Sequence, residues 1–186
     1  MLLLVGLGNP GSNYTNTRHN IGFKIIDAIN AHFKLSKQKP KFKGLLTTGN
    51  IDEKKIYAIK PLTFMNNSGT AIKELIDYFK IDAKDVIVFH DDMDIDFGKI
   101  KAKFGGSSAG HNGIESIDKF IGKDYSRVRI GIGKPKGPIE VSDYVLQNFD
   151  DEEIMGVEKI SKNITESLSI LVEKKLDLFS STVNNK

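Results

Sequence analysis

Apolar residues fall along the chain in short continuous runs and in alternating stretches, and both patterns predict strands. Residues 2–8 are a run that glycines end, and residues 85–92 are a second run, typical of a strand that is covered on both faces. The segments 44–51 and 54–60 flank a turn and predict a hairpin. Two further strands are expected at 98–104 and 125–135.

Elsewhere the apolar residues recur at intervals of three and four, which predicts helices. One such segment is 20–33, and another ends near Phe79, with Ser68 placed to cap its start. A short helix is expected over 111–122. After about residue 138 the pattern is helical, and residues 154–171 predict one long amphipathic helix.

The alternation of strands and helices favours a single α/β domain over residues 1–186. We expect one central sheet with helices on both faces, followed by a helical C-terminal region. The hairpin requires an antiparallel pair, so the sheet is predicted to be mixed rather than purely parallel.

Composition is typical of a globular protein in a reducing compartment. Hydrophobic residues make up 39% of the chain and charged residues 27%, and there is no cysteine. The first residues lack the basic start of a signal peptide, and no apolar run approaches membrane-spanning length. The expected location is therefore the cytoplasm, without a membrane partner.

The net charge is only +3, but lysines gather in two segments. One is 34–43, and the other alternates Lys99, Lys101 and Lys103, so that a strand there would place all three on one face. Most lysine clusters are solvated surface, and binding of a phosphate backbone is the leading alternative. The second cluster is the better candidate because it leads into a glycine-rich segment.

Several polar residues stand where strand and helix patterns break, which is where a scaffold usually presents site chemistry. They are Asn9, His19, Asn66, Asp91 and Asn112. The set contains a base, an acid that could orient it and neutral amides, with no obvious nucleophile. Because imidazole titrates near neutral pH, this inventory predicts attack by water on a polar ester or amide, with His19 as the base.

Two glycine-rich motifs allow other functions, and both matches are incomplete. GLGNPG fits a dinucleotide-binding fingerprint, but a proline interrupts it and a polar stretch precedes the next helix. GSSAG fits a nucleophile elbow with Ser108, but that fold needs a downstream histidine and none follows His111. The simpler interpretation is a turn that presents Asn9 and a flexible loop before a helix.

The segment HDDMD, residues 90–94, brings an imidazole and carboxylates to a strand end. Such a group could hold a divalent metal, but nothing else in the chain completes a recognisable ligand set. It is simpler for one carboxylate to hold an imidazole in its reactive tautomer. We therefore expect no metal and no cofactor.

Taken in order, the motifs resemble those of one enzyme family. They are VGLGNPG, Y-x-x-T-R-H-N-I-G, TFMN-x-S-G, HDDMD, GG-x-x-x-GHNG and R-x-R-I-G-I-G. Together, over about residues 3–150, they closely resemble bacterial peptidyl-tRNA hydrolase. One departure is at Ser107 and Ser108, where relatives often carry glycines or a histidine.

The resemblance implies hydrolysis of the ester between a peptide, or an N-blocked aminoacyl group, and the 3′-terminal ribose of tRNA. It implies that His19 activates the water, that Asp91 orients and stabilises His19, and that Asn9 separates blocked from free aminoacyl-tRNA. Asn66 and Asn112 would position the substrate and its oxyanion. Other implied substrate or tRNA contacts are Tyr14, Phe64, Met65, His111, Lys101, Lys103 and Arg129.

The expected partner is the acceptor end of peptidyl-tRNA, with no obligate protein partner. A monomer is expected because no exposed apolar seam stands out. The alternative is a non-catalytic RNA-binding module of the same fold. Such a module would keep the lysines and aromatic residues, but it would not need His19 and Asp91 in one crevice.

Overall fold

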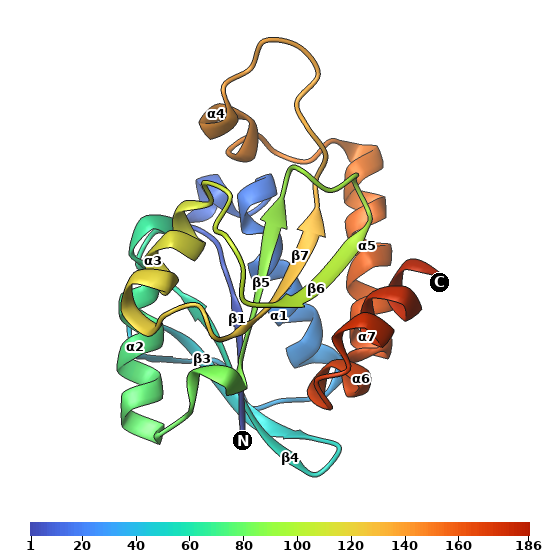
Figure 1. The fold of residues 1–186 in the computed structure, drawn as a ribbon. Coiled ribbons are helices and arrows are strands. Elements are labelled where there is room, and N and C mark those ends of the chain that lie inside the picture. The colour runs from blue at the N-terminus through green and yellow to red at the C-terminus, as the bar shows by residue number, and fades with distance from the viewer.

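A central sheet of seven strands organises the computed structural model, which describes residues 1–186 (Figure 1). The strand order is β2-β3-β4-β1-β5-β7-β6. The strands are β1 (Leu2–Gly6), β2 (Lys39–Lys41), β3 (Gly44–Ile51), β4 (Lys54–Pro61), β5 (Val86–Asp92), β6 (Ile100–Phe104) and β7 (Ser126–Gly131). The predicted hairpin is present as β3 and β4, which pair antiparallel.

The sheet is mixed, as expected, and its middle is parallel. β1 pairs in parallel with β4 and β5, and β5 pairs in parallel with β7. β2 and β6 are antiparallel edge strands. Because β4, β1, β5 and β7 point the same way, their carboxyl ends meet at one edge, where ligand sites of such sheets usually lie.

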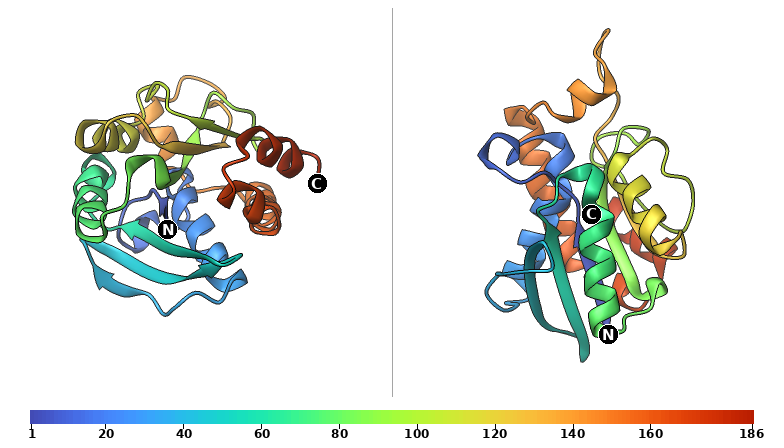
Figure 2. Two further views of the ribbon diagram at one scale, coloured as in Figure 1. Left: turned by 60° about the horizontal axis from the view of Figure 1, so that its bottom comes forward. Right: turned by 90° about the vertical axis from the view of Figure 1, so that its left-hand side faces the viewer.

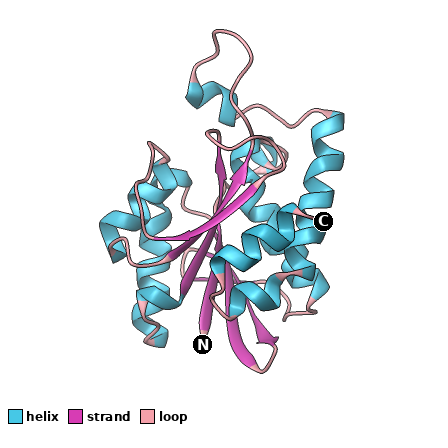
Figure 3. Cartoon of the chain, turned by 45° about the vertical axis from the view of Figure 1, so that its right-hand side comes forward, coloured by secondary structure: helices cyan, strands magenta, loops and turns pink.

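Helices cover both faces of the sheet (Figures 2 and 3). They are α1 (Ile21–His32), α2 (Ser68–Phe79), α3 (Asn112–Ile121), α4 (Val141–Val145), α5 (Asp151–Glu166), α6 (Leu168–Val172) and α7 (Leu176–Asn184). α2 and α3 pack on one face, and α1 packs with the C-terminal helices on the other. None of the helices is long and apolar enough to span a membrane.

Alternation along β1 explains how one strand serves both faces. Leu2 and Leu4 join the cluster beneath α1 and α5, whereas Leu3 and Val5 join the cluster beneath α2 and α3. All of these side chains are buried. A continuous apolar run therefore marks a central strand, because successive side chains enter opposite cores.

The prediction that Ser68 caps a helix was wrong. Asn67 occupies the cap position of α2 and makes no capping bond with its side chain, and Ser68 is the first helical residue. The Ser68 hydroxyl instead donates to the carbonyl of Met65 at 2.8 Å. The preceding single turn, η3 (Met65–Asn67), already leads the chain into the helix, so Ser68 ties that turn to α2.

The single long helix expected over 154–171 was also wrong. α5 begins at Asp151, with a capping box formed by Asp150 and Glu153, and it ends at Glu166, with the buried Ser167 at its C-cap. α6 then continues with Leu168 and Leu171 in the same apolar cluster. The apolar spacing continues through the break because both helices pack on one core, which explains why the pattern concealed it.

Close packing at Gly22 fixes how α1 sits on the sheet. A Cβ atom at this position would lie 2.4 Å from the backbone nitrogen of Leu7 and 2.5 Å from the carbonyl oxygen of Phe89. Both are backbone atoms, one just after β1 and one within β5, and backbone cannot give way as a flexible side chain can. The start of α1 therefore lies directly on the carboxyl edge of the sheet.

We expect Gly22→Ala to lower the free energy of unfolding by about 1–3 kcal/mol, because the added methyl overpacks this contact. Denaturant unfolding measures the change. Ala31→Ser, at an exposed position of the same helix, is the matched control and should stay within about 0.5 kcal/mol. Equal stability of the two variants would contradict the close approach of α1.

Candidate active site

The carboxyl edge of the sheet gathers polar side chains from four separate segments. Asn9 follows β1, and Asp91 lies near the end of β5. His19 lies in a single turn, η2 (Arg18–Asn20), just before α1, and His111 lies just before α3. The packing of α1 through Gly22 brings His19 over the strand ends.

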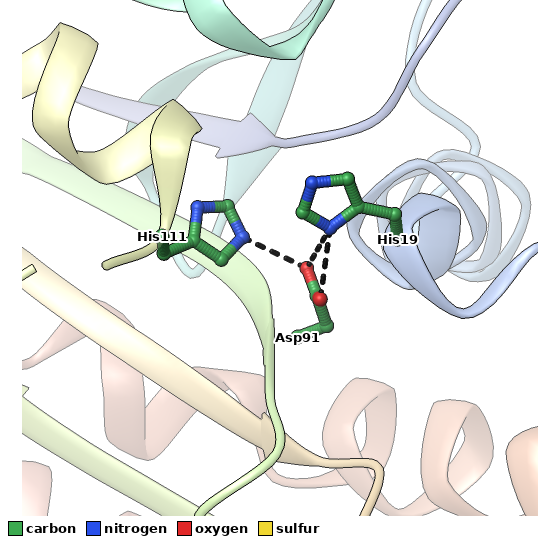
Figure 4. A group of neighbouring side chains, drawn as sticks. All are labelled: His19, Asp91 and His111. Atoms are coloured by element: carbon green, nitrogen blue, oxygen red, sulfur yellow. Dashed lines mark hydrogen bonds and ion pairs between the residues drawn. The ribbon is translucent and has the colours of Figure 1, made fainter. Parts of the chain in front are cut away.

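His19, Asp91 and His111 form a hydrogen-bonded cluster (Figure 4). The His19 Nδ1 atom lies 2.9 and 2.8 Å from the two carboxylate oxygens of Asp91. The His111 Nε2 atom lies 2.8 Å from Asp91 Oδ1. Asp91 is only 3% exposed, so its charge is satisfied mainly by the two imidazoles.

The cap of α3 fixes the tautomer of His111. Its Nδ1 atom accepts hydrogen bonds from the backbone N–H groups of Gly113 and Ile114, at 3.1 and 3.2 Å. The proton of a neutral ring must then be on Nε2, which donates to Asp91. Since an ionised carboxylate only accepts, His19 likewise donates through Nδ1, and its Nε2 atom keeps a lone pair.

The carboxylate controls the protonation of this cluster. Burial by itself would lower the pKa of His19, but the charge and hydrogen bond of Asp91 raise that pKa above its ordinary value. Burial would raise the pKa of Asp91, whereas His19 and His111 hold it well below the usual range of a carboxyl group. The structure therefore favours an ionised acid beside a base of strengthened basicity.

His90 is close to the cluster but does not share its charge. Burial, reinforced by the neighbouring His111, lowers the pKa of His90 to about 3. Its Nδ1–H donates to the backbone carbonyl of Asp91 at 2.8 Å. The ring of His90 is thus neutral at physiological pH and cannot serve as a second titrating base there.

His19, Asp91 and His111 offer ligand atoms within 4.8 Å of one another, which is the spacing of a possible metal site. The cap of α3 argues against ligation by His111, because its one lone pair is already engaged at Nδ1. A metal at Nε2 would have to displace a proton and disturb the cap. The donor set therefore favours a hydrogen-bonded cluster over a metal centre.

A hollow of about 350 Å³ opens beside the cluster. It is lined by the end of β5, the loop before α3 and the segment around α4. Of the predicted residues it includes His19, Asp91, His111 and Asn112. A larger cavity of about 600 Å³ lies between α1 and α5 and contains none of the predicted site residues.

Asn9 lies in an adjoining hollow of about 250 Å³ and is held rigidly. Its Oδ1 atom accepts from the backbone N–H of Met65 at 2.7 Å. Its backbone N–H donates to Asn20 Oδ1, and Asn20 Nδ2 donates back to its carbonyl. The bond from Met65 fixes the orientation of the amide, and its Nδ2 group, which has no partner within the chain, is left as a donor for a ligand.

Phe64 is exposed rather than part of the core, with 52% of its surface accessible. Its backbone has φ 61° and ψ 156°, a strained conformation for a residue with a side chain. The ring meets Tyr14 edge to face, with centroids 6.4 Å apart. The next residues diverge, since Met65 is buried whereas Asn66 is exposed and lies outside both hollows.

The expectation of three aligned lysines holds only in part. Lys101 and Lys103 alternate within β6 and face Arg129 and Arg127 across the pairing with β7, but Lys99 precedes the strand. Arg129 also donates to Asp92 at 2.7 Å. The basic surface therefore comprises Lys101, Lys103 and a partly neutralised Arg129.

Two residues that shape the site were not identified from the sequence. Asn20 holds Asn9 in place, and the buried Arg127 donates to the carbonyl of Ser107 and to Asp118, at 2.8 and 2.9 Å. The polar cluster around His19 was a signal for Asn20. Nothing in the alternation of β7 distinguishes Arg127, because its partners come from the loop and from α3.

We expect Asp91→Asn to lower the pKa of His19. The carboxylate stabilises the imidazolium form, and burial alone favours the neutral ring. NMR titration of the imidazole resonances measures the shift without requiring activity. Asp96→Asn, an exposed change in the same loop, is the control. A His19 pKa that stays constant in Asp91→Asn would disprove the proposed electrostatic coupling.

Comparison with known proteins agrees with the motifs. A family model described as peptidyl-tRNA hydrolase matches residues 3–186. The chain is 74% identical to a peptidyl-tRNA hydrolase of Pelagibacter ubique over 186 residues, covering 100% of both chains. It is 46% identical to one from Ehrlichia canis over 183 residues, covering 98% of this chain and 94% of the relative.

Solved structures show the same architecture. The crystal structure of peptidyl-tRNA hydrolase from Acinetobacter baumannii matches with a TM-score of 0.91 and 33% identity, covering 99% of this chain and 94% of that one. The α/β fold expected from the sequence is thus confirmed. With the match to the family model and the identity to its members, the chain belongs to the peptidyl-tRNA hydrolase family, enzymes that hydrolyse peptidyl-tRNA.

Proposed function

We propose that His19 is the general base of this hydrolysis and acts through its Nε2 atom. The carrying observation is the buried pair in which the His19 Nδ1–H donates to Asp91. Nε2 takes a proton from water as the water oxygen bonds to the ester carbonyl carbon. When the bond from that carbon to the ribose oxygen breaks, the same proton passes to the leaving oxygen.

Asp91 holds His19 in the tautomer that this step requires and stabilises the imidazolium formed when the proton arrives. His111 acts on His19 through Asp91. Its Nε2–H donates to Asp91 Oδ1, which orients the carboxylate and keeps it ionised.

Neutral amides would stabilise the oxyanion that develops at the ester carbonyl. Asn112 lines the hollow that holds His19, and Asn66 is exposed on η3. One well-placed donor is worth about 3 kcal/mol in the transition state. An uncharged donor does this without placing a cation beside His19, which would lower the pKa of the base.

Asn9 is suited to select N-blocked substrates. Its Oδ1 atom is engaged by Met65, so only the Nδ2 donor is presented to the substrate. A blocked substrate offers a carbonyl oxygen that accepts this bond. A free aminoacyl group offers an ammonium, which has donors only and would oppose the Asn9 donor. The mismatch leaves a polar site unpaired, which is a strong basis for discrimination.

The acceptor end of the tRNA is the proposed macromolecular ligand. Tyr14 and Phe64 form an aromatic pair near Asn9 that can stack on unpaired bases. Lys101, Lys103 and Arg129 form the basic surface at the β6 end of the sheet. A non-catalytic binding module is disfavoured, because RNA binding alone has no use for the buried His19–Asp91 pair.

We expect His19→Ala to reduce kcat for N-acetyl-aminoacyl-tRNA by about 10²–10⁴-fold, the usual contribution of a general base. Release of the acyl group is measured with EDTA present and with free aminoacyl-tRNA as a second substrate. His32→Ala, at an exposed histidine of α1, is the matched control. Normal turnover by folded His19→Ala would assign the base to another residue.

We expect Lys101→Ala or Lys103→Ala to raise KM for tRNA substrates and to flatten its dependence on salt. Each lost phosphate contact should reduce the slope of log affinity against log salt by about 0.7–0.9. Lys159→Ala, an exposed change on α5, is the control. If a short substrate without the tRNA body is affected equally, the lysines do not act through phosphate.

A further inference from the structure

Arg18 immediately precedes His19 in the chain, and the proposed catalytic steps do not use its buried side chain. The residue is only 9% exposed. Its Nε atom is buried without a hydrogen-bond partner. Burying a charge costs desolvation free energy, and replacing a buried ion pair by apolar residues is often neutral or stabilising. Its partners therefore indicate what the charge does.

The side-chain hydrogen bonds of Arg18 go to α4, to the segment that follows it and to the first turn of α5. Its guanidinium donates to the backbone carbonyl of Tyr144 at 3.3 Å and to Gln147 Oε1 at 3.4 Å. It donates to Glu153 Oε1 at 3.0 Å. The guanidinium carbon also lies 4.3 Å from the centre of the Tyr144 ring. One side chain thus joins the His19 turn to both ends of the linking segment.

The backbone strengthens the same connection. The N–H of Arg18 donates to the carbonyl of Gln147 at 3.0 Å, and the N–H of Phe149 donates to the carbonyl of Asn16 at 3.0 Å. Thr17 forms an isolated antiparallel bridge with Asn148. Backbone hydrogen bonds therefore join the segment before His19 to the segment after α4 at several positions.

α4 is one wall of the catalytic hollow. Glu140, Val141, Ser142 and Val145 from this segment line it together with His19 and Asp91. Figure 1 shows α4 and the loop before it projecting beyond the carboxyl ends of β5 and β7. Apart from the Tyr144 hydroxyl, which donates to the carbonyl of Ile132 at 2.9 Å, the hydrogen bonds that anchor the wall run through Arg18 and its neighbours.

Glu153 ties a third element to this joint. Its Oε1 atom accepts from Arg18 at 3.0 Å and from the backbone N–H of Asp150 at 3.1 Å, closing the capping box of α5. The position of α5 on the core therefore sets the position of the carboxylate, and the carboxylate sets that of Arg18. The α4 wall and His19 are therefore both positioned relative to the start of α5.

The geometry points to Arg18 as a positioning residue of the hydrolysis: through Glu153 and Tyr144 it holds the α4 wall at a fixed place relative to His19, and so sets the binding of the peptidyl-tRNA end in the hollow. The inference rests on the proposed role of His19. Arg18 touches no reacting atom, and it acts on substrate binding rather than on proton transfer.

The test compares Arg18→Gln, Glu153→Gln and the double variant with wild type, using N-acetyl-aminoacyl-tRNA. Glu152→Gln, an exposed change in the same first turn of α5, is the matched control. Glu153→Gln keeps an oxygen for the cap and loses the charge that Arg18 meets, so it stays informative if Arg18→Gln does not fold. Thermal unfolding of every variant sets the working temperature.

We expect KM to rise about tenfold in each single variant with kcat nearly unchanged, because a binding wall acts equally on the ground and transition states. The double variant should be no worse than the poorer single variant, since both break one joint. The midpoint of the acidic limb of kcat should not move. Amide hydrogen exchange over 141–147 should become faster than in the Glu152→Gln control.

Three results would overturn the inference. Unchanged KM with lower kcat, or a shifted acidic midpoint, would mean that Arg18 acts on His19 itself. Reduced thermal stability with unchanged kinetic constants and exchange would leave Arg18 a purely structural residue. Additive effects of the two changes would separate Arg18 from Glu153. Failure of the general-base proposal is distinguishable, because it is decided by the turnover of His19→Ala.

Discussion

The active end of this molecule depends on one buried carboxylate that two imidazoles share. Asp91 accepts a hydrogen bond from His19 Nδ1 at 2.8 Å and another from His111 Nε2 at 2.8 Å. Such a charge is tolerated in the interior only when its lone pairs are satisfied. The requirement that both rings reach one carboxylate fixes the start of α1, the start of α3 and the end of β5 relative to one another. Gly22 makes this possible on one side, since its lack of a side chain lets α1 approach the strand ends.

The two histidines differ in what their second nitrogen does, and that difference assigns their roles. His111 uses Nδ1 to cap α3, so it has no free lone pair and acts as a fixed donor. No such bond engages the second nitrogen of His19, which is therefore available as a base. The hydrogen bonds of the cluster thus favour the proposed roles, with His19 as base, Asp91 as its acid and His111 as a support, over a metal site.

The sequence predicted the layers of the fold and the centre of the site more fully than the joints between elements. Continuous apolar residues mark strands such as β1 and β5 in the sequence. His19 and Asp91 stand where the apolar patterns of strands and helices break. The end of α5 at Glu166 and the contacts of Arg18 were not predictable in this way. The apolar spacing continues unchanged from α5 into α6, so it does not reveal the break. The partners of Arg18 lie more than a hundred positions away along the chain. The local sequence pattern indicates the type of element and the chemistry of its residues, but it does not indicate which distant residues will pair.

An enzyme that holds a polyanion next to an essential carboxylate must keep the two charges from opposing each other. Asp91 is buried and accepts hydrogen bonds from two imidazoles, so a phosphate cannot contact it directly. Two acidic residues that line the hollow have a cationic neighbour, since Asp92 is paired with Arg129 and Asp94 lies 3.7 Å from Lys134. Lys101 and Lys103 form no ion pair within the chain, which suits the proposed contacts with phosphate. Because exposed charges farther apart than about one Debye length, ~8 Å at physiological salt, are largely screened, the local lysines matter more to the proposed phosphate contacts than the net charge of +3.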